Sequence, residues 1–280
     1  MGSGGPLRVA IQGERGAFSH QAAIEALGAA TEVVPRGTFE ELFASVAEGR
    51  ADRALVPIEN SLHGSIHENY DRLQHSPLHI VGETQLRIRQ CLIARPGSAL
   101  GTIRRVSSHP VALAQCRRFF AEHPQVEAVT AYDTAGAVRD LMDGGLATQG
   151  AIASALAAEL YRAQVVLEGI EDDPENYTRF LLLAAEPGPI EAATKTSMVF
   201  VLDNRPGSLH EALGVFASRG VDLCKLESRP LRGHPWEYSF YLDVLGDPRG
   251  VAGEALEELK RSARELRILG SYPEGVSRSG

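Results

Sequence analysis

The residues of this 280-residue chain that could do chemistry stand in short polar stretches beside apolar runs. In residues 176–180 (NYTRF), a hydroxyl at Thr178 and a guanidinium at Arg179 stand just before three consecutive leucines. An arginine that leads into a buried strand needs an anionic partner, because a buried unpaired charge is costly. That partner could be a ligand in a wet cleft or a carboxylate of the protein itself, and the residues alone leave both open.

A second polar group, Glu59, Asn60 and Ser61, directly follows an apolar strand pattern at residues 54–58. In open α/β sheets the carboxyl ends of the strands line the ligand crevice, so these side chains are candidates for a binding site. Asn60 or Ser61 could equally cap a following helix.

The turn at residues 13–16 (GERG) lies between a predicted strand and a predicted helix. Free backbone N–H groups at a helix start favour anions, but the G-x-x-G spacing is neither a dinucleotide nor a P-loop fingerprint, and an ordinary tight turn has the same pattern. Ser108 and Thr134 stand at two further predicted helix starts, where capping explains them as well as a ligand contact does.

His63 and His67 are four residues apart, with two glutamates nearby. On a helix such a pair could share a metal ion, but the sequence places no third ligand. We therefore expect a solvated helix face and no metal site.

The elements that must position these groups alternate between strand and helix up to about residue 167. Residues 7–12 alternate as a strand, and Thr38 with Glu41 forms a capping-box signature for a helix that ends at Gly49. This alternation predicts a mixed or parallel α/β sheet with helices on its faces. Residues 186–194 read as a linker, and the order βαββαβ beyond it predicts a ferredoxin-like unit. At about 80 residues such a unit is marginal alone, so pairing with a second copy is expected.

Composition narrows the function. The chain has 28 Lys+Arg against 36 Asp+Glu, a net charge of -8, and no basic block, which argues against nucleic-acid binding. Because the protein is acidic overall, an anionic substrate would have to be bound by a few positively charged groups located in the binding site itself. Three widely spaced cysteines favour a reducing, cytoplasmic location, and no apolar run is long enough for a membrane span. Residues 1–6 lack the apolar region of a secretory signal and read as a flexible leader.

Taken together and in order, eight stretches resemble prephenate dehydratase with a C-terminal ACT regulatory domain. They are GERGAFSHQAA (13–23), ALVPIENSLHGSI (54–66), SSHPVALAQC (107–116), DTAGAV (133–138), AIASALAAELY (151–161), NYTRFLLL (176–183), PGSLHEAL (206–213) and KLESRP (225–230). The chain departs from the family pattern at Ala17, Val111 and Ser208, where Thr, Gln and Ala are common. The related arogenate dehydratases share many of these motifs, so arogenate is the alternative substrate.

The resemblance implies a two-lobed, periplasmic-binding-protein-like catalytic domain over residues 7–185, with the active site between the lobes. We expect one lobe at about residues 7–80 plus 165–185 and the other at 81–164, followed by the linker at 186–194 and an ACT domain at 195–275. The implied reaction converts prephenate to phenylpyruvate, CO2 and water in phenylalanine biosynthesis, without a cofactor.

The resemblance also implies roles for single residues. Thr178 would donate a hydrogen bond to the leaving hydroxyl, and Arg179 would pair with a substrate carboxylate. Glu59 would be either an ionised orienting group or, if desolvated, an acid with a raised pKa. The expected substrate-binding residues are Asn60, Ser61, Ser108, Thr134, Asn176, Phe180, Gly16 and Ser19.

The ACT domain resembles a phenylalanine sensor that binds its effector where two such domains pair. The expected effector-binding residues are Asn204, Gly207, Ser208, Leu209, His210, Glu227, Ser228, Arg229 and Pro230, and the expected assembly is a homodimer or homotetramer. A non-catalytic amino-acid sensor is a further alternative. The intact Thr178-Arg179-Phe180 triplet argues against it, since a pure sensor has no evident use for that hydroxyl.

Overall fold

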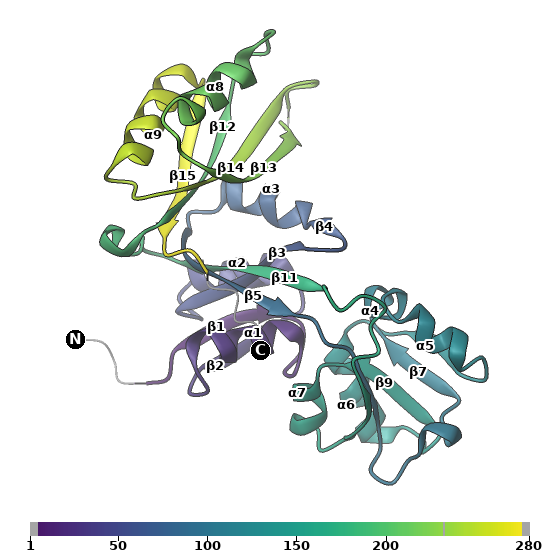
Figure 1. Cartoon of the computed structure of the whole chain (residues 1–280). Helices are drawn as coiled ribbons and strands as arrows, with labels where there is room; N and C mark the ends of the chain where they lie inside the picture. Colours follow the sequence, from purple (N-terminus) through teal and green to yellow (C-terminus); the bar gives the residue numbers. More distant parts are fainter. Residues whose placement is uncertain (1–4, 232, 276–280) are drawn as a thin grey trace.

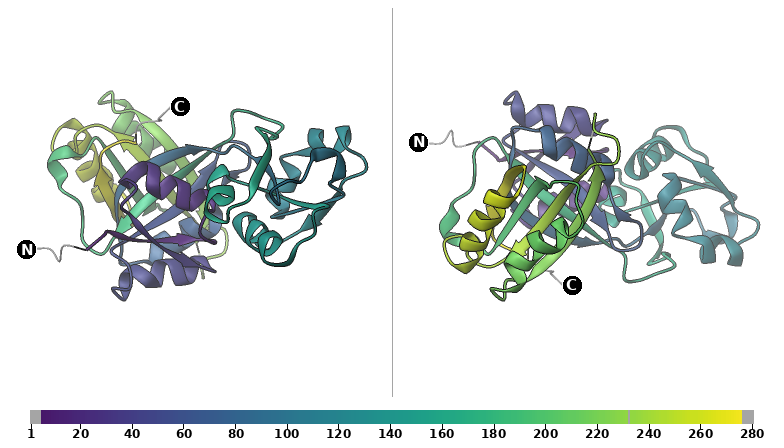
Figure 2. Two further views of the ribbon diagram at one scale, coloured as in Figure 1. Left: turned by 90° about the horizontal axis from the view of Figure 1, so that it is seen from below. Right: turned by 90° about the horizontal axis from the view of Figure 1, so that it is seen from above.

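The computed structural model describes residues 5–231 and 233–275, and three β-sheets organise them into two lobes and a C-terminal domain (Figure 1). Figure 1 shows the C-terminal domain at one end and the second lobe at the other, with the first lobe between them, and both views in Figure 2 show the second lobe standing to one side of the other two parts. Over the described residues, none of the helices has the length and apolar character that a membrane crossing requires.

The first lobe is built on a sheet with the strand order β2-β1-β3-β11-β5, to which β4 adds by pairing with β3. The first three strands are parallel, whereas β11 arrives from much later in the chain and runs antiparallel to β3 and β5. The strands are β1 (Arg8–Gln12), β2 (Glu32–Arg36), β3 (Arg53–Asn60), β4 (Gly64–Ser65), β5 (His79–Arg87) and β11 (Tyr177–Ala184), and the helices are α1 (Phe18–Leu27), α2 (Phe39–Ala47) and α3 (His67–His75).

Local sequence signals explain the elements of this lobe. The hydroxyl of Thr38 accepts a hydrogen bond from the backbone N–H of Glu41 (3.2 Å), which confirms the predicted cap of α2. β3 is apolar over most of its length because helices cover both faces of the sheet, and it is less buried only at its ends, at Arg53 and at Glu59 and Asn60. The polar side chains of Glu59 and Asn60 therefore lie at the carboxyl end of a central strand.

The second lobe contains a sheet with the order β10-β6-β9-β7-β8. Its strands are β6 (Cys91–Ala94), β7 (Arg105–Ser108), β8 (Glu127–Thr130), β9 (Gln149–Ala153) and β10 (Gln164–Glu168), and its helices are η1 (Leu100–Thr102), α4 (Pro110–Ala114), α5 (Arg117–Glu122), α6 (Thr134–Gly144) and α7 (Ala155–Leu160). Side chains cap α4 and α6, at the residues next to Ser108 and Thr134: His109 accepts from the N–H of Val111, and Asp133 accepts from the N–H of Gly136.

The lobe boundaries differ from those expected. β5 pairs with β11 in the first sheet, and β10 pairs with β6 in the second. Residues 81–87 therefore belong to the first lobe and residues 165–168 to the second, and the chain crosses between lobes at residues 88–90 and 169–176. The expected boundaries rested on local patterns, whereas strand pairing over long sequence separations decides which sheet a strand joins.

The C-terminal domain has the ferredoxin-like order β13-β14-β12-β15, in which neighbouring strands are antiparallel. Its elements are β12 (Lys195–Val201), α8 (Ser208–Ala217), β13 (Leu223–Pro230), β14 (Tyr238–Leu245), α9 (Val251–Ser262) and β15 (Glu265–Tyr272). A short helix, η2 (Ile190–Ala192), lies within the expected linker. The predicted two-lobed α/β architecture with a ferredoxin-like unit is confirmed.

The C-terminal sheet is covered on both faces. α8 and α9 pack on one face, around Met198, Phe200 and Leu242. The other face contributes Val199, Tyr241 and Tyr272 to a core cluster that it shares with the first lobe, including Leu73, Ile80 and Leu183. The two backbones approach so closely that a Cβ at Gly270 would lie 2.0 Å from the carbonyl oxygen of Ile80. The domain is therefore packed firmly onto the first lobe.

Candidate active site

A cavity of about 360 Å³ lies between the two lobes, a volume that suits a small-molecule ligand. The first lobe and its hairpin contribute Phe18, Ser19, Pro57, Asn60, His63, Gly64, Ser65, Ile66, Thr178 and Phe180. The crossover and the second lobe contribute Ile88, Gln90, His109, Val111, Ala112, Gln115 and Thr134. A larger, more open groove of about 660 Å³ runs between α2 and α3, and Arg229 is its one predicted site residue. The inter-lobe cavity is the better candidate, because it brings together Asn60, Thr178, Thr134, Ser19 and Phe180.

Asn60 and Thr178 are register partners on the paired strands β3 and β11. The Nδ2 of Asn60 donates to the Oδ1 of Asn176 (2.8 Å), and its second proton is shared between the carbonyl of Tyr177 and the Oγ1 of Thr178 (3.1 Å each). Its Oδ1 accepts from the backbone N–H groups of Leu62 and His63 (3.0 Å each). These contacts fix the amide orientation. The hydroxyl of Thr178 then acts as an acceptor toward Asn60, and its own proton remains available for a ligand.

Five polar residues of the cavity were not among the expected site residues: His63, Ser65, Gln90, His109 and Gln115. Gln115 ends α4, and its Oε1 accepts from the Nε2 of Gln90 (3.1 Å). Gln90 is 2% exposed, and its Oε1 has no partner among the described residues, so it can accept a hydrogen bond from a ligand. Both glutamines are polar residues within apolar segments, Gln115 in ALAQC (112–116) and Gln90 in RQCLIA (89–94), and this pattern could have identified them as candidates.

His63 is another of these five residues, and the helical setting expected for it is wrong. His63 lies in the hairpin between β3 and β4, and α3 begins only at His67. The ring of His63 lines the cavity, whereas His67 is directed toward the C-terminal domain, with its Nε2 3.4 Å from Glu227. The two histidines therefore do not share one face.

Several expected binding residues support the cavity without lining it. The hydroxyl of Ser61 donates to the carbonyl of Glu175 (2.7 Å), and that of Ser108 donates to the carbonyl of Ile152 (2.6 Å). Asn176 is fully buried behind Asn60. These side chains hold loops and strands in place, so the expectation that they contact the substrate is not met by this geometry.

The glycine turn contacts the second lobe instead of presenting N–H groups to the cavity. Gly16 has φ +91°, and a Cβ there would lie 2.8 Å from the Cα of Ala157. Its carbonyl accepts from the hydroxyl of Ser154 (2.6 Å), and its N–H donates to His20 (2.9 Å). Arg139 of the second lobe pairs with Glu14 of the turn (2.9 Å). The turn thus joins the lobes, and only α1 just beyond it reaches the cavity.

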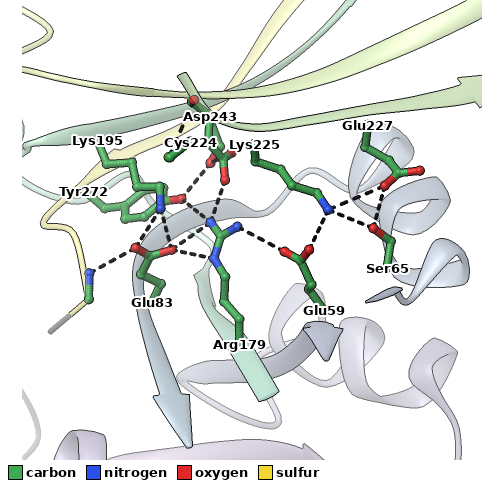
Figure 3. A network of polar contacts seen from close by, with 12 residues as sticks. Glu59, Ser65, Glu83, Arg179, Lys195, Cys224, Lys225, Glu227, Asp243 and Tyr272 are labelled. Atoms are coloured by element: carbon green, nitrogen blue, oxygen red, sulfur yellow. Dashed lines mark hydrogen bonds and ion pairs between the residues drawn. The ribbon is translucent and has the colours of Figure 1, made fainter. Parts of the chain in front are cut away.

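Arg179 points away from the cavity, contrary to expectation. Successive side chains on a strand face opposite ways, so Thr178 and Phe180 face the cavity while Arg179 faces the C-terminal domain. Its side chain is 12% exposed, and its guanidinium lies 2.6 Å from Asp243 and 2.7 Å from Glu83 (Figure 3). The protein's own carboxylates therefore satisfy it, which is the alternative that the residues had left open.

Glu83 and Lys195 complete a buried, electrically balanced group with Arg179 and Asp243, which we call the four-charge junction. The Nζ of Lys195 is 2.9 Å from Glu83, whose side chain is 2% exposed. Burial opposes ionisation of Glu83, but the charges of Arg179 and Lys195 and hydrogen bonds from Lys195 and the Gly275 N–H outweigh it and hold its pKa below the ordinary value. Two positive and two negative groups thus join the first lobe to the C-terminal domain.

Glu59 also faces the C-terminal domain, and it does not line the cavity. Its Oε1 accepts from the Nζ of Lys225 (2.8 Å), and the same ammonium donates to the hydroxyl of Ser65 (2.9 Å). Ser65 in turn donates to Glu227 (2.5 Å), as Figure 3 shows. Ser65 is thus a cavity-lining residue that also contacts the expected effector motif.

The other expected effector residues lie on two elements. Asn204 and Gly207 precede α8, with Gly207 in the left-handed region (φ +85°), and Ser208, Leu209 and His210 begin that helix. Glu227, Ser228, Arg229 and Pro230 end β13, an edge strand of the C-terminal sheet. Arg229 makes a bidentate pair with Asp71 of the first lobe (3.0 Å for both contacts). An effector site that uses both elements stays a prediction.

The charge of the cavity is unusual for an anion site. Among the described lining residues there is no lysine, arginine, aspartate or glutamate, and the titratable side chains are His63 and His109. Residues at the N-termini of α1 and α6 line it as well, and helix N-termini favour anions. Positive potential for an anionic ligand therefore comes from the helix N-termini, and Arg179 is not its source.

Comparisons with known proteins agree on one family. A family model described as prephenate dehydratase matches residues 9–188. An Arabidopsis thaliana protein named arogenate dehydratase/prephenate dehydratase 2, chloroplastic, is 46% identical over 286 residues, covering 98% of this chain and 74% of the relative. A solved Arthrobacter aurescens prephenate dehydratase in complex with L-Phe has a TM-score of 0.86 at 35% identity, covering 95% of this chain and 90% of that one. A structure described as GqqA, a novel type of quorum quenching acylase, has a TM-score of 0.88 at 37% identity, covering 95% and 98%.

Proposed function

The chain belongs to the prephenate dehydratase family, and from this premise we propose that it converts prephenate to phenylpyruvate, CO2 and water. The observation that carries the proposal is the contact between Asn60 and Thr178. Because Asn60 donates to the Oγ1 of Thr178, the threonine proton is free to be donated to the departing hydroxyl of the substrate.

The reaction breaks two bonds of the substrate ring. The bond to the ring carboxylate breaks and its electron pair enters the ring, while the C4–O bond breaks with its pair on the departing hydroxyl. Prephenate dianion and one proton from solvent thus become phenylpyruvate monoanion, CO2 and water. Thr178 is a poor Brønsted acid at neutral pH, so its part is a positioned hydrogen bond at the oxygen where negative charge develops. Gln90, Gln115 and Thr134 supply further polar contacts in the cavity.

Substitution of Thr178 tests this proposal. Thr178→Val keeps the shape of the side chain and removes the hydroxyl, so kcat is expected to fall roughly 10²–10³-fold. Thr178→Ser keeps the hydroxyl and is expected to retain most of the rate. Turnover is followed as phenylpyruvate formation, with circular dichroism to show that both variants are folded. A Thr178→Val enzyme with the kcat of the wild type would refute the assigned role.

Arogenate is the second candidate substrate, because the 46% identical relative is named for both activities. Arogenate carries an amino group where prephenate carries a keto group, and its net charge is one unit less negative. Comparing kcat/KM for both compounds with one enzyme preparation decides the preference. The same preparation, incubated with an acyl amide, checks the acylase activity named for the structural neighbour.

We also propose that L-phenylalanine inhibits the enzyme from its C-terminal domain, an ACT domain by resemblance. In support, a structural neighbour was solved in complex with L-Phe, and Glu227 of the expected effector motif contacts the cavity hairpin through Ser65. Lys225→Met removes the ammonium shared by Glu59 and Ser65, and is expected to weaken inhibition more than it changes kcat. Wild-type enzyme with no calorimetric binding of L-phenylalanine would refute this regulation.

We also propose an assembly and a location for the chain. β13 is an edge strand, Leu226 and Tyr238 beside that edge are each 44% exposed, and pairing of two such edges would continue the sheet into a homodimer or homotetramer. Light scattering after size exclusion gives the mass. A cytoplasmic location rests on the three cysteines, which are free thiols in the structure, and imaging of a tagged chain tests it.

A further inference from the structure

We propose that His63 is a positioning residue for the dehydration, acting on Thr178 through the side-chain amide of Asn60. This inference rests on the proposed function, because it concerns the same cavity and the same hydroxyl. Sequence patterns gave His63 no role, and its place in the hairpin between β3 and β4 reveals the contact.

The first step is the protonation of the imidazole ring. The Nδ1 of His63 lies 3.1 Å from the Oδ1 of Asn60, and an amide oxygen has no proton to donate. Nδ1 must therefore carry the proton and donate it to Asn60. The same Nδ1 is 3.4 Å from the Nε2 of Gln115, and with two donors facing each other that longer contact is not a hydrogen bond.

The second step is the transmission through the amide. The Oδ1 of Asn60 accepts from His63, while its Nδ2 donates toward the Oγ1 of Thr178 (3.1 Å). Hydrogen bonds in a chain polarise one another, so a stronger donor on the oxygen of the amide makes its N–H a stronger donor too. A stronger hydrogen bond to the oxygen of Thr178 in turn makes the threonine proton a better donor to the leaving hydroxyl.

The third step is charge. Histidine changes its charge between about pH 5 and 8, and the imidazolium is a stronger donor than the neutral ring. The other titratable side chain that lines the cavity is His109 of the second lobe, whose Nδ1 accepts from the N–H of Val111. The neighbouring Glu59 and His67 are directed to Lys225 and Glu227 of the C-terminal domain. Protonated His63 would therefore also add positive charge to a cavity that holds no lysine or arginine among its described lining residues.

The test compares His63→Asn, His63→Ala and wild type in steady-state kinetics from about pH 5.5 to 8.5, with the uncatalysed rate subtracted. Asparagine can place an amide N–H near the position of Nδ1 but does not titrate. For His63→Ala we expect kcat about tenfold lower, with a smaller change in KM, since the lost contact acts on a transition-state donor. His63→Asn should recover much of this rate at high pH, and its kcat should vary less with pH than that of wild type. His75→Asn, an exposed histidine of α3 outside the cavity, is the matched control and should keep the wild-type profile.

A double-mutant cycle tests the route through Thr178. If His63 acts through that hydroxyl, His63→Ala should cost little additional rate in a Thr178→Val background. The inference is overturned if His63→Ala keeps the kcat and pH profile of wild type, or if its loss is the same in both backgrounds. Absence of turnover in wild type with prephenate and arogenate would instead refute the proposed function, and the inference with it.

Discussion

Replacing Arg179 by methionine separates two roles for this residue, substrate binding and domain attachment. Methionine keeps the length and apolar stem but removes the charge. In the variant, Glu83 keeps Lys195 as its partner, whereas Asp243 keeps only neutral donors such as the hydroxyl of Ser197 (2.5 Å). Breaking a buried ion pair by removing one partner typically costs about 3–5 kcal/mol, because a charge is left buried and uncompensated. At roughly 3 °C per kcal/mol, a loss near 4 kcal/mol lowers the apparent Tm by about 12 °C.

Differential scanning calorimetry and steady-state kinetics on the same preparation decide between the roles. The structure predicts a large drop in Tm and a KM for substrate that changes by less than about threefold at 25 °C, where the variant is still folded. Arg179→Met combined with Asp243→Leu should regain part of the lost stability, since no charge is then orphaned at that position. A KM raised tenfold or more with an unchanged Tm would show that Arg179 binds the substrate after all, and the argument from its position would be wrong.

Three further predictions concern close contacts and acid stability. Gly16→Ala puts a Cβ 2.8 Å from the Cα of Ala157 at a residue with φ +91°, so the contact between the two lobes should be disrupted. We expect a higher KM for the substrate and a lower Tm, and an unchanged KM would contradict the role of this contact. Gly270→Ala puts a Cβ 2.0 Å from the carbonyl oxygen of Ile80, so the C-terminal domain should detach more readily; limited proteolysis in the linker should become faster. The folded-state pKa of Glu83 lies below the ordinary value of 4.5, so the stability that ionised Glu83 contributes is present above pH 4.5 and is lost as the pH falls through the folded-state pKa. The Tm of Glu83→Gln should therefore fall less than the Tm of wild type when the pH is lowered through this range.

The fold was accessible from the sequence because its signals are local and periodic. The capping box at Thr38, the apolar run of β3 and the βαββαβ pattern each reflect short-range physics, and each corresponds to an element of the structure. The expected crossover points were less accurate, because the sheet that β5 joins depends on pairing with β11 nearly a hundred residues later. Local patterns contain no information about that partner.

In the site, too, local sequence patterns identified some residues, whereas others depended on contacts between distant segments. The rule that ligands bind at the carboxyl ends of strands led to Asn60, and the NYTRF stretch at residues 176–180 led to Thr178. Both residues line the cavity. Strand alternation, applied to residues 178–180, would have put Arg179 on the opposite face. His63 could not be placed, because β4 has only two residues and a short hairpin of this kind leaves no periodic signal. The role of Glu59 depended on Lys225, which reaches it only because the C-terminal domain packs on the first lobe.

The four-charge junction limits how this chain can exchange domains with its relatives. Its two positive and two negative groups come from both sides of the contact: Arg179 and Glu83 from the catalytic part, Lys195 and Asp243 from the C-terminal domain. Each side is neutral alone, yet the shortest pair, between Arg179 and Asp243, crosses between them. A chimera that receives a C-terminal domain with an uncharged residue at position 243 or 195 would bury an unmatched charge, even if every apolar contact were preserved. The catalytic part and the C-terminal domain of this protein must therefore change together, and shuffling experiments should transfer these four positions as one unit.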